Sequence, residues 1–249
     1  MSIIDTFDPV SSEIIDPYQA IRPVEGFPER VLVCFTYKFA ELIAQKTNAR
    51  EISVLKGGRI IPIYQCEYKG HTFAFYHTLL GGAATAGLLE EIFAKGAQKA
   101  LFFGSCGSLD NDLTAGKLIV PTAAYRDEGV SYHYAPASDF IDIPTAERLC
   151  GIFDSLKIPC AKTKTWTTDA IYRETEQNMR RRKAEGCGVV EMECASVMAV
   201  GQYRKKEVYQ FLYAADSLIS GWDRRILGAM PEDMREQIAE IALEVLIRL

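Results

Sequence analysis

The chain has 249 residues, 48% hydrophobic and 24% charged, which suits one globular α/β domain or two small ones and excludes a disordered chain. Its net charge of −5 argues against a nucleic-acid partner, because phosphate backbones favour basic surfaces. No apolar run approaches the roughly 20 residues of a membrane helix, and the acidic N-terminus is unlike a signal peptide, so we expect a cytoplasmic protein.

Cysteine and histidine are not arranged as ligands. The seven cysteines are scattered and odd in number, which is typical of reduced thiols. The three histidines, His71, His77 and His133, show no metal-ligand spacing. We therefore expect neither a metal nor another bound cofactor.

From residue 29 onward, strand and helix patterns alternate, after an irregular arm at 1–28 that is rich in Pro and Asp. Apolar runs predict strands at 31–35, 60–66, 72–78, 100–103, 117–125, 160–167, 187–192 and 207–215. Helical spacing of apolar positions predicts helices over 38–47, 83–95, 144–156, 174–185, 193–203 and 231–248. We expect a single α/β domain at 29–249, with a central, mostly parallel twisted sheet flanked by helices.

Three of the predicted strands end in polar clusters: 104–107 (Gly-Ser-Cys-Gly), 191–193 (Glu-Met-Glu) and 216–217 (Asp-Ser). Ligands of such sheets bind at the carboxyl ends of the strands. A buried strand seldom ends in a carboxylate without a use for it, because an unpaired buried charge is costly. We expect the functional site here.

From about residue 31 to 217 the chain resembles the nucleoside phosphorylase and nucleosidase superfamily, and its strongest match is 188–195 (Gly-Val-Val-Glu-Met-Glu-Cys-Ala). The resemblance implies a three-layer fold and a ribose site, in which Glu193 binds the ribose hydroxyls and Met192 packs beneath the sugar, with Glu191 beside them. A carboxylate with two acceptor oxygens suits a vicinal diol. The alternative is that Glu193 is only a helix N-terminal acid that interacts with the helix dipole.

Asp216 follows Glu193 by 23 positions. The resemblance gives it the role of protonating purine N7 as the bond to ribose breaks, and a partly desolvated carboxyl with a raised pKa can supply that proton. The alternative is an ordinary helix N-cap. Because uridine phosphorylases lack this aspartate, the base is expected to be a purine.

The resemblance places phosphate at the 104–107 turn, where Gly104 and Ser105 would offer backbone N–H groups and a hydroxyl. Gly82, in the glycine turn at 81–84, would lie beside the same site. Arg59 stands where uridine phosphorylases carry an arginine that reaches phosphate in the neighbouring subunit. A tight turn at 104–107 and a solvated surface arginine at 59 are the alternatives.

Residues 169–173 resemble the loop that flanks the base, with Ile171, Tyr172 and Arg173 as base-binding candidates. Ile171 falls where the family has an aromatic, so it offers dispersion without stacking. The residues with which uridine phosphorylases read uracil would fall at Thr175 and Gln177 and do not match. Residues 127–136 nevertheless resemble a uridine phosphorylase stretch, whose aromatics fit a core equally well.

Two phosphate-binding arginines of the family are missing: their positions are Phe39 and Phe102. Each charge-assisted contact of this kind is worth about 1.5–3 kcal/mol, so phosphate binding should be weak or rebuilt. Lys38 or Arg173 could substitute as point charges but not as bidentate partners. Hydrolytic members activate water with a glutamate in the first loop, and the nearest carboxylate, Glu41, lies one turn too far.

The sequence therefore predicts cleavage of the N-glycosidic bond of a nucleoside, expected to be a purine nucleoside, by phosphorolysis to base and ribose 1-phosphate. Phosphate would be a co-substrate, and the protein a homo-oligomer, either a dimer or a hexamer built from that dimer, as in the family. A phosphate-independent nucleosidase and a non-catalytic nucleoside-binding protein are the alternatives.

Overall fold

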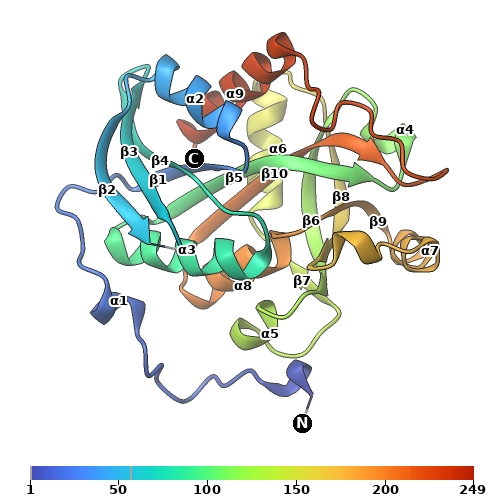
Figure 1. Ribbon diagram of the computed structural model, residues 1–249, viewed down its shortest axis with the longest axis horizontal. Helices are drawn as coiled ribbons and strands as arrows, with labels where there is room; N and C mark the ends of the chain where they lie inside the picture. Colours follow the sequence, from blue (N-terminus) through green and yellow to red (C-terminus); the bar gives the residue numbers. More distant parts are fainter. Residues whose placement is uncertain (1, 57) are drawn as a thin grey trace.

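In the computed structural model, which describes residues 2–56 and 58–249, strands and helices alternate along the chain as predicted (Figure 1). The strands are β1 (Arg30–Cys34), β2 (Arg50–Lys56), β3 (Ile60–Tyr68), β4 (His71–His77), β5 (Lys99–Ser108), β6 (Leu118–Asp127), β7 (Phe140–Asp142), β8 (Cys160–Thr168), β9 (Cys187–Glu191) and β10 (Glu207–Ser217). The longer helices are α2 (Tyr37–Lys46), α3 (Gly82–Lys95), α6 (Ala146–Ser155), α7 (Glu176–Ala184), α8 (Cys194–Tyr203) and α9 (Glu232–Leu246). Short helical turns are η1 (Ile3–Asp5), α1 (Pro17–Ala20), α4 (Asn111–Thr114), α5 (Ser131–Tyr134) and η2 (Ile171–Arg173).

All strands join one sheet, in the order β10-β6-β8-β9-β5-β1-β4-β3-β2, with β7 beside β6. Because β10 also pairs with β5, the strands β5, β10, β6, β8 and β9 close into a ring. The single α/β domain with a helix-flanked sheet is confirmed, but the sheet is mixed. Among the described residues, five strand pairings are parallel and five antiparallel, because hairpins and the ring closure add antiparallel pairs around the parallel centre β4-β1-β5-β10.

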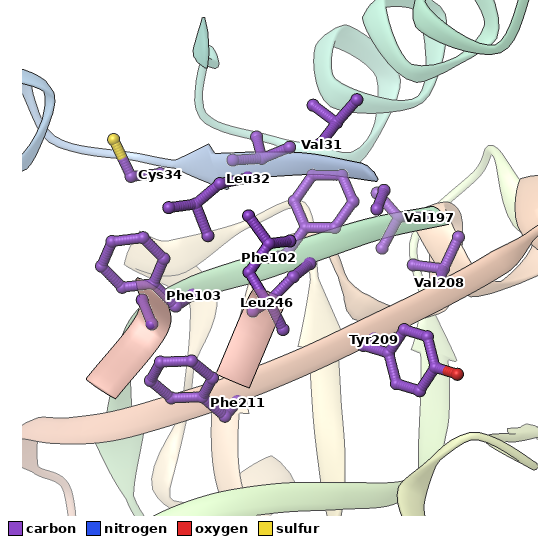
Figure 2. Close-up of a cluster of buried hydrophobic side chains, with 14 of the residues drawn as sticks. Val31, Leu32, Cys34, Phe102, Phe103, Val197, Val208, Tyr209, Phe211 and Leu246 are labelled. Carbon is purple, nitrogen blue, oxygen red and sulfur yellow. The ribbon is translucent and has the colours of Figure 1, made fainter. Parts of the chain in front are cut away.

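Helices cover the central strands on both faces. The helices α2, α6 and α9 pack on one face, and α3 and α8 pack together on the other. Figure 2 shows the resulting core, in which Phe103 and Phe211 stack with ring centroids 5.6 Å apart, near Leu246. Burial on both faces explains why β1 reads as a continuous apolar run rather than an alternating one.

The predicted elements agree with the structure to within a few residues, and the Lys69-Gly70 turn joins β3 to β4 with positive φ at both positions. The strands β2 and β7 were not predicted, because Arg50–Lys56 lies at the sheet edge with charged residues at both of its ends, and Phe140–Asp142 has only three residues. Of the arm expected at 1–28, residues 2–28 are described and contain only η1 and α1, and Glu13 joins this segment to Arg204 through a 3.0 Å ion pair. Among the described residues, no helix is long and apolar enough to cross a bilayer.

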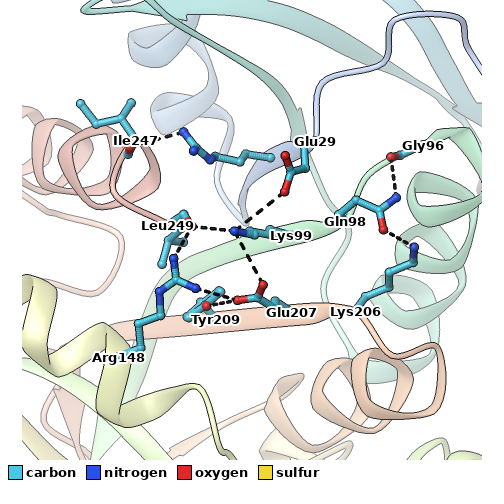
Figure 3. A network of polar contacts seen from close by, with 11 residues as sticks. Glu29, Gly96, Gln98, Lys99, Arg148, Lys206, Glu207, Tyr209, Ile247 and Leu249 are labelled. Carbon is cyan, nitrogen blue, oxygen red and sulfur yellow. Dashed lines mark hydrogen bonds and ion pairs between the residues drawn. The ribbon is translucent and has the colours of Figure 1, made fainter.

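A polar network fastens the end of the chain to the sheet, at the amino ends of β5 and β10 (Figure 3). The Lys99 ammonium donates to the backbone oxygen of Leu249 over 2.7 Å and lies 3.6 Å from Glu207. Arg148 pairs with Glu207 at 3.1 Å and also donates to the Leu249 oxygen. Because this network occupies the opposite strand ends, the carboxyl ends of β5 and β10 are free to form a site.

We expect Gly201→Ala to lower the free energy of unfolding by about 1–3 kcal/mol, because overpacking forces neighbours to shift. A Cβ at position 201 in α8 would lie 2.5 Å from Val208 Cγ2 in β10. The matched control is Gly151→Ala in α6, where no described atom lies within 4 Å of the added carbon. The control should be neutral or stabilising by about 0.5–1 kcal/mol. Urea unfolding of both variants measures the difference, and equal stabilities would contradict the packing of α8 on β10.

Candidate functional site

The three polar strand ends meet at one cavity of about 850 Å³, which is mostly apolar and large enough for a nucleoside. Ser105 and Gly107 reach it from β5, Glu193 from the turn after β9, and Asp216 from β10. The register explains the meeting, since Gly107 pairs with Val190 on one side and with Asp216 on the other. Residues more than 100 positions apart thus share one site.

Glu191 forms the turn between β9 and α8. Its Oε2 accepts the backbone N–H groups of Glu193 and Cys194, at 2.7 and 2.6 Å, and its Oε1 accepts the hydroxyls of Thr167 and Thr165, at 2.5 and 3.2 Å. Burial raises the pKa of Glu191, and these four donors act against that rise. The sequence resemblance grouped Glu191 with the ribose ligands, and in the structure both of its oxygens already accept hydrogen bonds from the protein.

Glu193 follows on the first turn of α8 and is only 6% exposed. Its Oε1 accepts the backbone N–H of Gly81 at 2.7 Å, and this is its one hydrogen bond through a side-chain atom among the described residues. Burial and the neighbouring Glu191 raise the pKa of Glu193 to about 8, so ligand hydroxyls would be needed to hold it as a carboxylate at neutral pH. Its carboxyl lines the cavity beside Met192, and it retains acceptor capacity for ligand hydroxyls.

Asp216 lies on β10 after a bulge between Ala214 and Asp216, which turns its side chain into the cavity. Its Oδ2 accepts the indole N–H of Trp222 at 2.8 Å. Burial raises the pKa of Asp216, while the Trp222 hydrogen bond and the charge of Arg225 lower it. The N-cap alternative fails, because no helix follows Asp216 directly.

The phosphate candidates are only partly gathered. Ser105 is exposed and lines the cavity, whereas Gly104 is buried and lies against the ring of Phe35: a Cβ at 104 would lie 2.7 Å from Phe35 Cδ2. Gly82 lies outside the lining, and its missing Cβ makes room for Ser196 on α8, whose Oγ would be 2.2 Å away. The close approaches at both glycines are therefore to protein side chains.

Arg59 is exposed in the turn between β2 and β3, outside the cavity lining, with its Nη2 3.4 Å from Nδ1 of His77. Within one chain it does not reach Ser105. The two suggested substitutes, Lys38 and Arg173, are likewise exposed and outside the lining, as is Glu41.

At the two positions where arginine was expected, Phe39 and Phe102 are core residues, 3% and 0% exposed. The ring of Phe39 packs on Phe103 at 5.0 Å, and that of Phe102 lies 6.2 Å from Phe35. No Lys, Arg or His lines the cavity among the described residues, whereas five acids do: Glu174, Glu176, Glu191, Glu193 and Asp216. The site is therefore electronegative.

The loop expected to flank the base forms the rim. Ile171 and Tyr172, 49% and 96% exposed, line the cavity, and Arg173 points elsewhere. Within the stretch 127–136, the buried residues Glu128 and Ser131 join a separate polar network, in which Arg126 donates to the Ser131 hydroxyl at 2.8 Å and Glu128 accepts from the Ser196 hydroxyl at 2.6 Å. These residues of the stretch that resembles a uridine phosphorylase segment thus make contacts inside the protein.

Sequence reasoning missed several residues of the cavity, including two polar ones, Glu174 and Gln210. Glu174 follows η2, and burial raises its pKa to about 7, with the negative charge of Asp216 adding to the rise. Gln210, 2% exposed on β10, pairs neither amide atom with any described residue and lines the cavity. A polar residue inside the otherwise apolar strand 208–212 was the available signal for Gln210. No group of His, Cys, Asp and Glu that could hold a metal occurs in residues 2–56 and 58–249.

Comparison with known proteins agrees with this geometry. The family profile described as the phosphorylase superfamily matches residues 29–249. Purine nucleoside phosphorylase of Plasmodium vivax (strain Salvador I) is 29% identical over 193 residues, 74% of this chain and 78% of that protein. Uridine phosphorylase of Thermococcus kodakarensis is 33% identical over 151 residues, 59% of this chain and 50% of that protein.

Solved structures share the fold. Purine nucleoside phosphorylase of Toxoplasma gondii, in complex with immucillin-H, superposes with a TM-score of 0.74 at 19% identity, over 95% of this chain and 97% of that one. AMP nucleosidase of Bacteroides thetaiotaomicron superposes with a TM-score of 0.71 at 18% identity, over 91% and 90% of the two chains.

We expect Phe102→Arg to destabilise the protein by several kcal/mol and not to create a phosphate site. The residue is fully buried, so the guanidinium would lose its hydration without gaining a partner. The matched control is Phe102→Leu, which should lose only about 1–3 kcal/mol through reduced packing. Thermal unfolding with and without 20-fold excess phosphate over the protein measures both effects. A Phe102→Arg protein as stable as the control and further stabilised by phosphate would show that position 102 faces the anion.

Proposed function

Because the chain belongs to the phosphorylase superfamily, we propose that it cleaves the N-glycosidic bond of a purine nucleoside. It is an enzyme of the nucleoside phosphorylase-like, pentosyltransferase type. In the proposed reaction Glu193 holds the ribose hydroxyls, Met192 packs beneath the sugar, and an acid in the cavity assists the departing base. Charge developing on the sugar is positive, and the electronegative cavity stabilises it.

The observation that carries this proposal is the arrangement of Glu193 and Asp216 around one apolar cavity. Glu193 is buried and keeps acceptor capacity, which suits a diol with two donors. Hydroxyls bound there would replace the water that burial removed, and would favour the carboxylate form of Glu193. A helix-terminal acid in contact with the dipole alone would not need burial beside a second carboxylate.

The purine assignment rests on Asp216 and on the absence of matching uracil-reading residues at Thr175 and Gln177, both of which lie outside the lining. The relatives are named for both purine and uridine phosphorylases. The rim residues Ile171 and Tyr172 offer an apolar surface to the base, and Gln210 offers an amide donor and acceptor at the buried end of the cavity.

For the nucleophile we propose phosphate, as the names of the relatives suggest. One chain supplies Ser105 but no cation to the lining. A homo-oligomer would supply the cation if Arg59, exposed on the β2–β3 turn, reaches the cavity of a neighbouring copy. Phosphorolysis and homo-oligomerisation therefore form a single proposal. We also propose that the protein is cytoplasmic.

The second candidate is hydrolysis, and the cation-free lining favours it specifically. A phosphate dianion entering a cavity with five acidic side chains meets repulsion, whereas water does not. Unlike Glu191, the carboxyls of Glu174, Glu193 and Asp216 each accept one hydrogen bond or none from the described residues, so one of them could take the proton that water loses.

We expect Glu193→Gln to lower kcat/KM for a ribonucleoside roughly 10- to 100-fold, because charge-assisted hydrogen bonds to the diol become neutral ones. The amide oxygen can still accept from Gly81, so the thermal unfolding midpoint should change little. The control is the substrate: with the 2′-deoxynucleoside, which lacks one hydroxyl, the penalty should shrink. A penalty equal for both nucleosides would remove Glu193 from the ribose site.

The rate of base release from inosine should be low at low phosphate and should saturate only at phosphate concentrations well above those that a two-arginine site would need, since each missing arginine contact weakens phosphate binding roughly ten- to a hundredfold. Arg59→Ala should reduce the phosphate-dependent rate further, while Arg50→Ala, an exposed arginine on β2, should not. Initial rates against phosphate, with the sugar product identified and the oligomeric state determined by sedimentation, test this. Ribose formed at a phosphate-independent rate selects hydrolysis, and a fully active monomer removes the role of Arg59.

A further inference from the structure

Two carboxyl groups of the cavity, Glu174 and Asp216, differ in their partners. Glu174 lies between η2 and α7, on the segment that also carries the rim residues Ile171 and Tyr172. Its carboxyl accepts no hydrogen bond and joins no ion pair within residues 2–56 and 58–249. Asp216 faces the same cavity from β10, accepts the Trp222 indole N–H at 2.8 Å and has Arg225 nearby.

These partners stabilise one charge and not the other. A hydrogen-bond donor and a nearby cation favour the ionised form of a carboxyl, and burial without donors favours the neutral form. When two carboxyls share an apolar cavity, a single proton therefore resides on the one without donors. Burial and the negative charge of Asp216 raise the pKa of Glu174 to about 7, so at neutral pH much of it is protonated.

On this geometry we infer that Glu174, rather than Asp216, is the catalytic residue that delivers a proton to the departing base. Trp222 is then a positioning residue, which keeps Asp216 as a carboxylate. The inference rests on the proposed function, because it concerns the same cavity and the same bond, but it reassigns the acid that the sequence resemblance placed at Asp216.

The step balances as follows. The bond between the anomeric carbon and the base nitrogen breaks, and its electron pair goes to the base. The base takes the carboxyl proton of Glu174 at N7, which leaves Glu174 as a carboxylate. Phosphate or water forms the new bond to the anomeric carbon, and the proton that this nucleophile loses restores Glu174 through solvent.

Other charged groups border the pair. Glu176 lies on α7 and pairs with Arg180, and Glu191 and Glu193 face the cavity from the turn after β9. Beside Asp216, the segment after β10 carries Asp223 as well as Arg225, which pair at 3.6 Å. Of all these groups, Asp216 is the one whose charge acts on Glu174.

The test compares a nucleoside that needs the proton with one that does not. Inosine requires protonation of its leaving base, whereas 7-methylinosine already carries a positive base and leaves without an acid. For the parent enzyme, kcat/KM for inosine should fall relative to that for 7-methylinosine as pH rises through about 7, because only protonated Glu174 can deliver the proton. The same profile for 7-methylinosine should lack this fall.

Glu174→Gln should lower kcat/KM for inosine by roughly 100-fold or more and abolish the fall near pH 7, while 7-methylinosine changes less than about threefold. The matched control, Glu185→Gln, alters an exposed glutamate at the other end of α7 that pairs with Arg182 outside the cavity. It should leave both profiles unchanged. Trp222→Phe should change the inosine profile, because removing the donor lets Asp216 compete for the proton.

The inference is overturned if Glu174→Gln keeps the inosine rate and its pH dependence while Asp216→Asn loses both and is rescued by 7-methylinosine. Equal losses for both nucleosides in Glu174→Gln would indicate a structural role and would also overturn it. If Glu174→Gln does not fold, the pH profile of Trp222→Phe decides. An unchanged fall near pH 7 would mean that the Trp222 hydrogen bond to Asp216 does not keep the proton on Glu174, and would overturn the inference. A parent enzyme that cleaves no nucleoside rejects the proposed function itself, and the inference with it.

Discussion

The site depends on one buried carboxylate, Glu191, which joins the end of β9 to the start of α8. Its two oxygens accept two backbone N–H groups of the turn and two threonine hydroxyls of β8, so the direction in which the chain leaves the sheet is fixed at four points. The helix α8 then packs against α3 through the glycine contact at Gly82 and Ser196. Glu193 is held between these elements, within reach of Gly81. A ribose ligand that must stand at a set distance from the base needs such a rigid support, because positional error weakens catalysis steeply.

The cavity is apolar and lined by acids, and that combination determines its chemistry. In such surroundings a carboxyl is ionised only where the protein supplies donors. Glu191 has four, Asp216 has an indole N–H, Glu193 has one backbone N–H and Glu174 has none. The carboxyls of the cavity therefore differ in the number of donors that the protein supplies to them, from four at Glu191 to none at Glu174. Neutral or cationic groups are favoured in such a cavity, which matches the positive charge that develops on a ribosyl transition state.

Most of the fold could be predicted from the sequence, because buried strands and amphipathic helices carry strong local patterns. The edge strand β2 could not, since half of its residues face solvent and its partner β3 is set by tertiary pairing. At the site, the strand-end motifs located the cavity correctly. The role of Glu191 could not be read from its position beside Glu193, because identical side chains two residues apart face different partners. Glu174 was also beyond prediction: its importance arises from burial and from Asp216, which lies 42 positions later in the sequence.

The aromatic residues at the expected arginine positions affect more than the anion contact. Phe39 packs on Phe103 and Phe102 lies beside Phe35, whose ring covers Gly104. These four phenylalanines belong to one hydrophobic core or pack against it, so replacing one of them with a charged residue would leave that charge among apolar neighbours. The loss of the cations is therefore built into the packing of β1, α2 and β5. A cation for an anionic nucleophile has to come from outside this core, which means from a segment at the rim or from a second copy of the chain. The nucleophile and the assembly state are for this reason linked questions, and an answer to one constrains the other.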